Sequence, residues 1–320
     1  LEYNCSVMIN EDLIKAIIAN SCEVFLPDTD KISKAKLHCK KLKLEREQQK
    51  KFNLLNTCGD ELGRQIALAS EKGASSWLSS LPLKHCGFVL TKQQFQDAIK
   101  IRYNIKMEGL SSECACGQQN SIDHALICKL EGYTALRHNH LRDTIASLIS
   151  VLCKDVVTEP TLLPLSNEQL PRGTTLSNDV RLDISCRGFY SALDKTFLDI
   201  RVLHPNSLSN AGKPLDRMYR SHENEKKTKY MHRVREVEKS NFTPFVMSTT
   251  GGLAPEAANF IKRLSAKLSQ RLCQSYSNVV GYVRRKLRFE LLKTTLMALR
   301  GFRKSKSVCI SELDLNLLNF

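Results

Sequence analysis

A compact set of metal-ligand side chains occupies residues 114–128. Cys114, Cys116, His124 and Cys128 follow the pattern C-x-C-x7-H-x3-C within 15 residues. Three thiolates and one imidazole suit tetrahedral Zn²⁺, and four protein ligands make a closed, structural site. A structural zinc supplies ~10–16 kcal/mol of apparent binding free energy, enough to fold a short segment that has almost no core. The alternative is three buried free cysteines beside an unrelated histidine; the compact spacing favours zinc.

A second group of candidate ligands follows on segments that look like β-strands. Asp183 lies in Arg-Leu-Asp-Ile-Ser and Asp199 in Phe-Leu-Asp-Ile-Arg-Val, a spacing that suits neighbouring strands. Carboxylates on adjacent strands can hold Mg²⁺, which polarises a scissile phosphate and helps to generate hydroxide. Glu159, beside an earlier strand, is a candidate third ligand or water-orienting group. The alternative for each carboxylate taken alone is a solvated surface residue.

Regular elements must bring these carboxylates together. From residue 137 the pattern predicts helix, strand, strand, strand, helix, strand and helix. The first helix carries one apolar stripe, formed by Leu141, Ile145, Leu148, Ile149 and Leu152. Strands are expected around Val156-Val157 and near 180–186, 196–203 and 242–248, helices near 215–239 and from Pro255, and a loop over 164–179. On the strand near 196–203, Phe197, Asp199 and Arg201 should share one face, with Leu198, Ile200 and Val202 on the other.

The first 110 residues read as a helical, basic region. Leu13, Ile14, Ile17 and Ile18 have helical spacing, and residues 31–51 carry nine Lys or Arg against two Glu. Thr91 resembles the N-cap of a following helix. Trp77 is interpreted as a core anchor, with a stacking platform for a base as the alternative.

The net charge of +15, with a pI near 9.3, favours a polyanionic partner. We expect DNA, with RNA as a second candidate. An anionic membrane surface and a merely solvated basic surface are the alternatives. Residues 262–304 hold twelve Lys or Arg and one Glu, which gives 12 − 1 = +11. Ile261, Leu264, Leu268 and Leu272 form a stripe that should dock this region on the core. The expected phosphate contacts are Arg263, Lys267, Arg271, Arg284, Arg285, Lys286 and Arg288.

Cysteine usage and hydropathy bear on the compartment. Nine of the twelve cysteines are scattered, unlike a secreted disulfide framework, so a reducing, intracellular environment fits better. No apolar run approaches the roughly 18 residues that span a bilayer, so we expect no membrane segment. Because the chain begins at Leu1 rather than Met, we expect it to be part of a longer product.

Residues 114–273 resemble the C-terminal part of site-specific non-LTR retrotransposon polyproteins. In that family a Cys/His knuckle precedes a restriction-like endonuclease of the PD-(D/E)XK superfamily. Its Arg-His-(Asp/Asn) is matched by Arg137-His138-Asn139 and its Glu-Pro by Glu159-Pro160. Its basic-x-Asp is matched by Arg181-Leu182-Asp183, and its Leu-Asp-hydrophobic strand by Leu198-Asp199-Ile200. Residues 73–82 also resemble the segment that joins a reverse transcriptase to the knuckle in metazoan elements.

The resemblance implies a role for each site residue. Asp183 and Asp199 would hold Mg²⁺, with Glu159 assisting. Arg201 stands where the superfamily has lysine, and because arginine stays protonated it would contact phosphate rather than act as a base. Some members take the lysine from the following helix, which makes Lys226 the first choice here; a solvated basic helix face is the alternative for this residue.

The expected architecture is therefore α/β, with a mixed sheet flanked by helices. Its parts would be a helical basic region over 1–110, a zinc knuckle over 111–136, a restriction-endonuclease-like core over 137–254, and basic C-terminal helices over 255–320. The resemblance implies an endonuclease, nuclear if active, that nicks DNA for target-primed reverse transcription. It also implies an upstream reverse transcriptase domain outside this chain, which itself contains no Tyr-x-Asp-Asp polymerase signature. The alternative is a non-catalytic, decayed or domesticated nucleic-acid-binding module.

Overall fold

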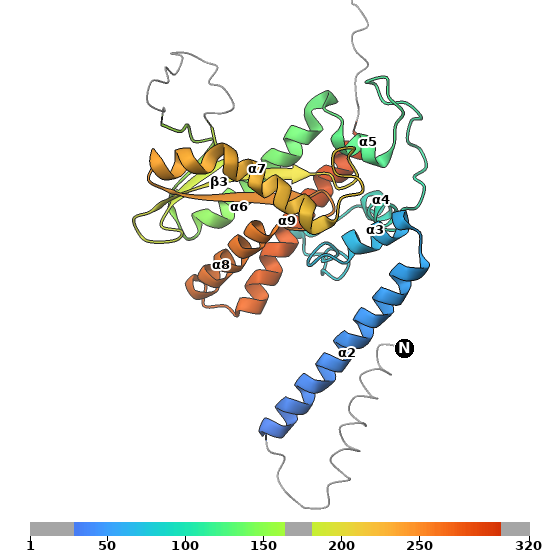
Figure 1. Ribbon diagram of the computed structural model, residues 1–320, viewed down its shortest axis with the longest axis horizontal. Coiled ribbons are helices and arrows are strands. Elements are labelled where there is room, and N and C mark those ends of the chain that lie inside the picture. The colour runs from blue at the N-terminus through green and yellow to red at the C-terminus, as the bar shows by residue number, and fades with distance from the viewer. Residues whose placement is uncertain (1–28, 164–180, 302–320) are drawn as a thin grey trace, which may run out of the picture. The chain divides into compact units, whose positions relative to one another are not determined.

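The computed structural model describes residues 29–163 and 181–301 (Figure 1). The chain divides after Gly63 into two compact units. The helical spacing at Leu13–Ile18 and the loop expected over 164–179 lie outside the described residues. In the described ranges the chain forms eight α-helices and one four-stranded mixed sheet, which agrees with the expected α/β class.

The first unit contains α2 (Thr29–Thr57) and the start of α3 (Asp60–Ala69). From residue 32 onward the side chains of α2 are almost all exposed, including apolar ones such as Leu37 and Phe52. Charge therefore dominates this helix, as expected for residues 31–51, and its apolar residues form no buried face.

The second unit is built on the sheet β1-β2-β3-β4. The strands are β1 (Lys154–Thr158), β2 (Ile184–Arg187), β3 (Lys195–Leu203) and β4 (Asn241–Ser248). The first three pair antiparallel, and β4 runs parallel to β3. A parallel pair needs a crossover, which α7 (Leu215–Glu236) supplies. The order of elements predicted from residue 137 is confirmed.

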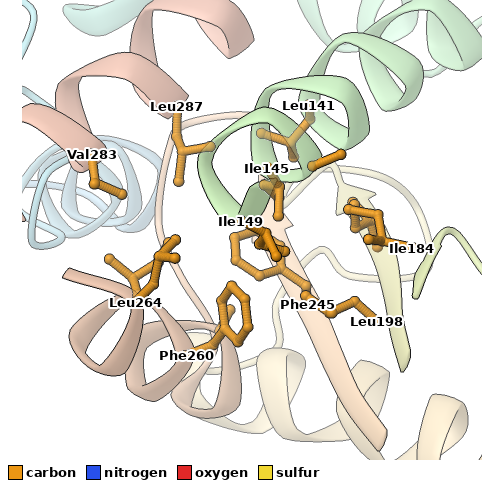
Figure 2. Packing of buried hydrophobic residues seen from close by; sticks show 14 of the residues in the cluster. Leu141, Ile145, Ile149, Ile184, Leu198, Phe245, Phe260, Leu264, Val283 and Leu287 are labelled. Atoms are coloured by element: carbon orange, nitrogen blue, oxygen red, sulfur yellow. The ribbon is translucent and has the colours of Figure 1, made fainter. Parts of the chain in front are cut away.

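The main core lies on one face of this sheet, under α6 (Tyr133–Ser150), α8 (Pro255–Arg271) and α9 (Tyr276–Arg300). Figure 2 shows Leu141, Ile145 and Ile149 of α6 pointing at the strands, where all three are fully buried. Their 3.6-residue spacing produces this packing. The predicted stripe on α8 is correct for its first three residues. The prediction for Leu272 is wrong, because this residue is the C-cap of α8 and is 50% exposed.

The opposite face of the sheet packs on α7. Phe197 joins Tyr230 and Val234 there, whereas Leu198 and Ile200 belong to the main core. The predicted alternation of β3 is thus confirmed, and it directs Asp199 and Arg201 toward α7.

A second core joins residues 74–126 to the C-terminal half of α9. Trp77, Phe88 and Leu126 pack there against Phe289 and Leu296. The segment contributes η1 (Lys84–Cys86), α4 (Lys92–Arg102), α5 (Ile122–Ile127) and η2 (Leu130–Gly132). The N-cap prediction is confirmed, since Thr91 and Gln94 form a reciprocal capping box. Trp77, 4% exposed, is the expected core anchor.

This packing corrects the expected boundaries. The chain divides at Gly63 rather than at 110, because residues 64–110 bury their apolar side chains against α9. Nor do α8 and α9 form an appended basic region, since their apolar faces complete both cores. Within the described ranges, no helix combines the length and apolar character needed to cross a membrane.

Candidate functional site

A tight turn brings the first two cysteines of residues 114–128 together. The Gly117 N–H donates to the Cys114 carbonyl, and the Cys114 N–H donates to the Gln118 carbonyl, both at 2.8 Å. Gly117 has φ = 83°, a left-handed conformation that glycine adopts without a Cβ clash. The C-x-C-G order therefore fixes both thiols on one side of the turn.

The short helix α5 supplies the other two ligands. Ser121 caps it by accepting from the His124 N–H at 3.0 Å, and the Cys128 N–H closes the last turn onto the His124 carbonyl. The four ligand atoms all lie within 4.8 Å of one another. The two closest contacts are Cys114 Sγ to Cys128 Sγ at 3.9 Å and Cys116 Sγ to His124 Nε2 at 3.3 Å.

These separations fit a four-coordinate zinc ion. With Zn–S bonds of about 2.3 Å and Zn–N bonds of about 2.0 Å, the edges of a tetrahedron measure roughly 3.5–3.8 Å. Burial raises the pKa of the Cys114 thiol, but hydrogen bonds from the Cys116 backbone and from His124 outweigh it and lower that pKa to about 7. The four residues predicted as zinc ligands thus form a cluster that can bind a metal such as zinc.

Two polar contacts tie this cluster to the sheet. Asp123, next to the ligand His124, lies 2.8 Å from the Nε2 of His204, the residue after β3. The Nδ1 of the buried His204 lies 2.8 Å from the Thr249 hydroxyl, just after β4. In addition, Arg137 of α6 is buried and donates to the Leu126 carbonyl of α5 at 2.9 Å.

Asp199 is the most buried of the predicted catalytic residues. It is 5% exposed, and its Oδ2 lies 2.6 Å from the Lys226 ammonium on α7. Burial raises the pKa of Asp199 to about 6; Lys226 opposes the shift and the nearby charge of Asp183 adds to it. The expectation that Lys226 reaches Asp199 from the following helix is confirmed, whereas Lys227 pairs with Glu256 at 2.6 Å.

Asp183 lies at a bend immediately before β2. Leu182 packs on the α7 side of the sheet and Ile184 on the α6 side, so the alternation breaks at this residue. The Asp183 side chain reaches along the sheet to β3, where Oδ2 accepts a hydrogen bond from the Ile200 N–H. Its Oδ1 lies 2.8 Å from His138 Nε2 on α6. The two aspartates therefore neighbour each other across adjacent strands.

Glu159 and Arg201 already have protein partners. Glu159 follows β1, is half exposed, and pairs with Arg142 and, at 3.9 Å, with Arg181. The described residues contain no group of three or more ligand side chains that includes Glu159 with the two aspartates. Arg201 faces α7 as expected, and its Nη1 lies 2.6 Å from Glu225.

The residues expected to contact phosphate differ in exposure. Arg263 and Arg271 are exposed on α8, and Lys267 is partly exposed. Arg284, Arg285 and Lys286 of α9 are partly buried; Arg285 lies over the Phe88 ring and Lys286 pairs with Glu290.

The assignment of Arg288 is wrong. Its side chain is 8% exposed and donates to the carbonyls of Ala74 at 2.8 Å and Thr249 at 3.3 Å. Burial lowers its pKa to about 10. This arginine links the segment after α3 to the end of β4, so it is not available to a phosphate.

Sequence reasoning gave no role to three residues that the site contains. His138 contacts Asp183, and Asp123 and His204 join the Cys/His cluster to the sheet. His138 stands in the Arg137-His138-Asn139 match, so a signal for it was present. Asp123 and His204 lie far apart in the sequence and carry no motif.

The chain was compared with protein-family models and with curated proteins, and neither comparison gave a match.

Proposed function

We propose that this chain is the endonuclease portion of a non-LTR retrotransposon protein, which nicks target DNA to expose a 3′ hydroxyl for reverse transcription. The observation that carries this proposal is the buried Asp199–Lys226 pair beside Asp183. An acidic pair with an adjacent lysine is the composition of a metal-dependent phosphodiesterase site. The order helix, three strands, helix, strand supports a restriction-endonuclease-like core.

In this proposal Asp183 and Asp199 would hold Mg²⁺. A bound Mg²⁺ polarises the phosphate and lowers the pKa of water. Both ligands are hard carboxylate oxygens, as Mg²⁺ prefers, and the repulsion between them together with burial favours binding of a cation. This donor set fits the ion.

The protein side chains have the remaining roles. Lys226, when it is released from Asp199, orients the attacking water or stabilises the charge that develops on the phosphate. Arg201 exchanges Glu225 for a phosphate oxygen, for which its planar guanidinium is suited. Glu159 assists only after it leaves Arg142. Zinc in the Cys/His cluster is structural, because four protein ligands leave no open position.

A nicking assay on supercoiled plasmid with Mg²⁺ tests the proposal. Asp183→Asn and Asp199→Asn should each abolish nicking and leave DNA affinity nearly unchanged, because the basic surfaces are intact. Asp155→Asn is the matched control, since this exposed strand aspartate lies outside the site. Nicking that persists in both site variants would contradict the assignment.

The second candidate is a non-catalytic nucleic-acid-binding module. It is favoured by the existing contacts of the carboxylates, because both Asp183 oxygens accept hydrogen bonds and Asp199 pairs with Lys226. Both candidates predict that α2 and the exposed face of α8 bind DNA, and RNA is the second candidate ligand. The affinity should weaken steeply as the salt concentration rises. Wild-type protein that binds DNA and never nicks it would support this second candidate.

The expected DNA contacts are tested on α8. Arg263→Gln combined with Arg271→Gln should weaken DNA binding about equally for all sequences and reduce its salt dependence. An affinity that does not change with salt would exclude an electrostatic interface. If DNA is the substrate, the protein acts where DNA is, in the nucleus.

A further inference from the structure

His138 makes a contact that the proposed chemistry does not yet use. It lies on α6, and its Nε2 is 2.8 Å from Asp183 Oδ1. An ionised carboxylate can only accept, so Nε2 carries the proton and donates. The side chain is 29% exposed, whereas that of Asp183 is 17% exposed. The bond is therefore shielded from water at the edge of the site.

The helix that carries His138 is fixed on both sides. Arg137, the preceding residue, is buried and donates to the Leu126 carbonyl. On the other face Leu141 and Ile145, both fully buried, anchor α6 to the sheet. The imidazole is thus presented from a rigid element, which is what a residue that orients another side chain requires.

Asp183 itself is held by two donors. His138 occupies one lone pair of Oδ1, and the Ile200 N–H occupies one lone pair of Oδ2. Each oxygen retains a second lone pair. Because Asp183 lies at a bend, the strand does not fix its side-chain direction, and these two donors do so instead.

We propose that His138 is a positioning residue that orients the Asp183 carboxylate toward the divalent cation shared with Asp199. The inference rests on the proposed function. Hydrogen-bond donors to ligating carboxylates typically change metal affinity or activity by about 10–100-fold when they are removed.

The test measures Mn²⁺ binding to the zinc-loaded full chain without DNA, by electron paramagnetic resonance. His138→Ala should raise the Kd for Mn²⁺ about 10-fold or more. His138→Gln should recover most of the affinity, because its amide N–H can donate in the same direction. His140→Ala is the matched control, two residues along the same helix with a 46% exposed side chain, and should leave the Kd unchanged.

The outcomes separate this inference from the proposed function. If Asp183→Ala abolishes Mn²⁺ binding while His138→Ala leaves the Kd unchanged, His138 has no positioning role and the proposed metal site remains. If neither Asp183→Ala nor Asp199→Ala affects Mn²⁺ binding, both proposals are wrong. Should His138→Ala fail to fold, His138→Gln and His138→Asn, whose side chain is shorter, replace it. Wild-type Mn²⁺ affinity in His138→Gln together with weakened affinity in His138→Asn supports the positioning role. Equal Mn²⁺ affinities of the two variants overturn it.

Discussion

The Cys/His cluster and the pair Asp183 and Asp199 differ in which groups can balance the negative charge of their side chains. The four ligands of the cluster come from one turn and one short helix, and their potential charges face one another. The carboxylates come from the bend before β2 and from β3, and each already has a partner on a helix, His138 for Asp183 and Lys226 for Asp199. We therefore expect the cluster to need a bound cation for its stability, whereas the carboxylates already have protein side chains as partners.

Soft and hard metal sites have different requirements. A closed zinc site needs its ligands at fixed separations and needs no further groups. A Mg²⁺ site must bind and release waters and phosphate, so its ligands can be held by groups that later exchange partners.

Removal of zinc should have the largest effect. Cys116→Ser combined with Cys128→Ser should lower the zinc content from one per chain to none, and the melting temperature should fall sharply. The loss reflects a metal contribution of ~10–16 kcal/mol in isolated zinc-binding segments. Elemental analysis and thermal unfolding measure it. Cys273→Ser, an exposed cysteine outside the cluster, is the control and should retain zinc; wild-type protein without stoichiometric zinc would refute the site.

Breaking the Asp199–Lys226 pair should have the next largest effect. Lys226→Ala leaves a buried carboxylate without its cation and should lower the free energy of unfolding by about 3 kcal/mol. Adding Asp199→Asn should recover most of the loss, because the buried charge is then removed as well. Urea unfolding measures both variants.

Lys239→Ala is the control for this cycle. Lys239 forms an exposed pair with Glu236, so its removal should change stability by less than about 1 kcal/mol. An equal loss in Lys226→Ala and in the double variant would mean that Lys226 does not neutralise Asp199.

Breaking the contact between Asp123, next to the Cys/His cluster, and His204, at the end of β3, should have a smaller effect on stability. Asp123→Ala removes the carboxylate partner of the buried His204 and should cost about 1 kcal/mol, a modest value because the Asp123 side chain is half exposed. The zinc content should stay at one per chain, since Asp123 is not a ligand. Asp143→Ala, an exposed helical aspartate, is the control. Loss of zinc in Asp123→Ala would show that the two regions are more strongly coupled than their contacts indicate.

The smallest effect should be a pH dependence near the cluster. The Arg300 guanidinium holds the pKa of the buried Asp97 below its usual range, and Arg300 also donates to the Glu108 and Gly109 carbonyls ahead of the cluster. A lowered folded-state pKa contributes stability above the unfolded value of about 3.9 and loses it as the pH falls through the folded value. The stability difference between wild type and Asp97→Asn should therefore be constant from pH 7 to 5 and shrink below about pH 4. A difference that stays constant to pH 3 would contradict this origin.

Local patterns predicted much of the fold. The alternation on β3, the stripe on α6 and the cap at Thr91 each depend on residues within one or two turns, and all three are confirmed. The domain boundary at 110 was wrong because it relied on composition. The apolar residues between 74 and 107 gave no sign that their partner would be α9, almost two hundred residues later in the chain.

The basic residues show the same limit. Arg263 and Arg288 belong to equally basic stretches of sequence, yet the first is exposed and the second is buried against two carbonyl groups. The sequence gives the position of a charged residue along a helix but does not show which helix face a neighbouring element will cover. A charged side chain on a covered face is buried, and one on an uncovered face is exposed.

The sequence by itself determined the Cys/His cluster, because its ligands, its glycine turn and its helix cap lie within a few residues of one another and backbone geometry alone brings them together. It also determined that Asp199 would project from the face of β3 opposite Leu198. Tertiary structure alone decided that Lys226 rather than Lys227 meets Asp199, and that His138 meets Asp183. Those contacts depend on the rotation of α7 and α6 against the sheet, which is set by the packing of many apolar side chains and not by the spacing of the polar ones.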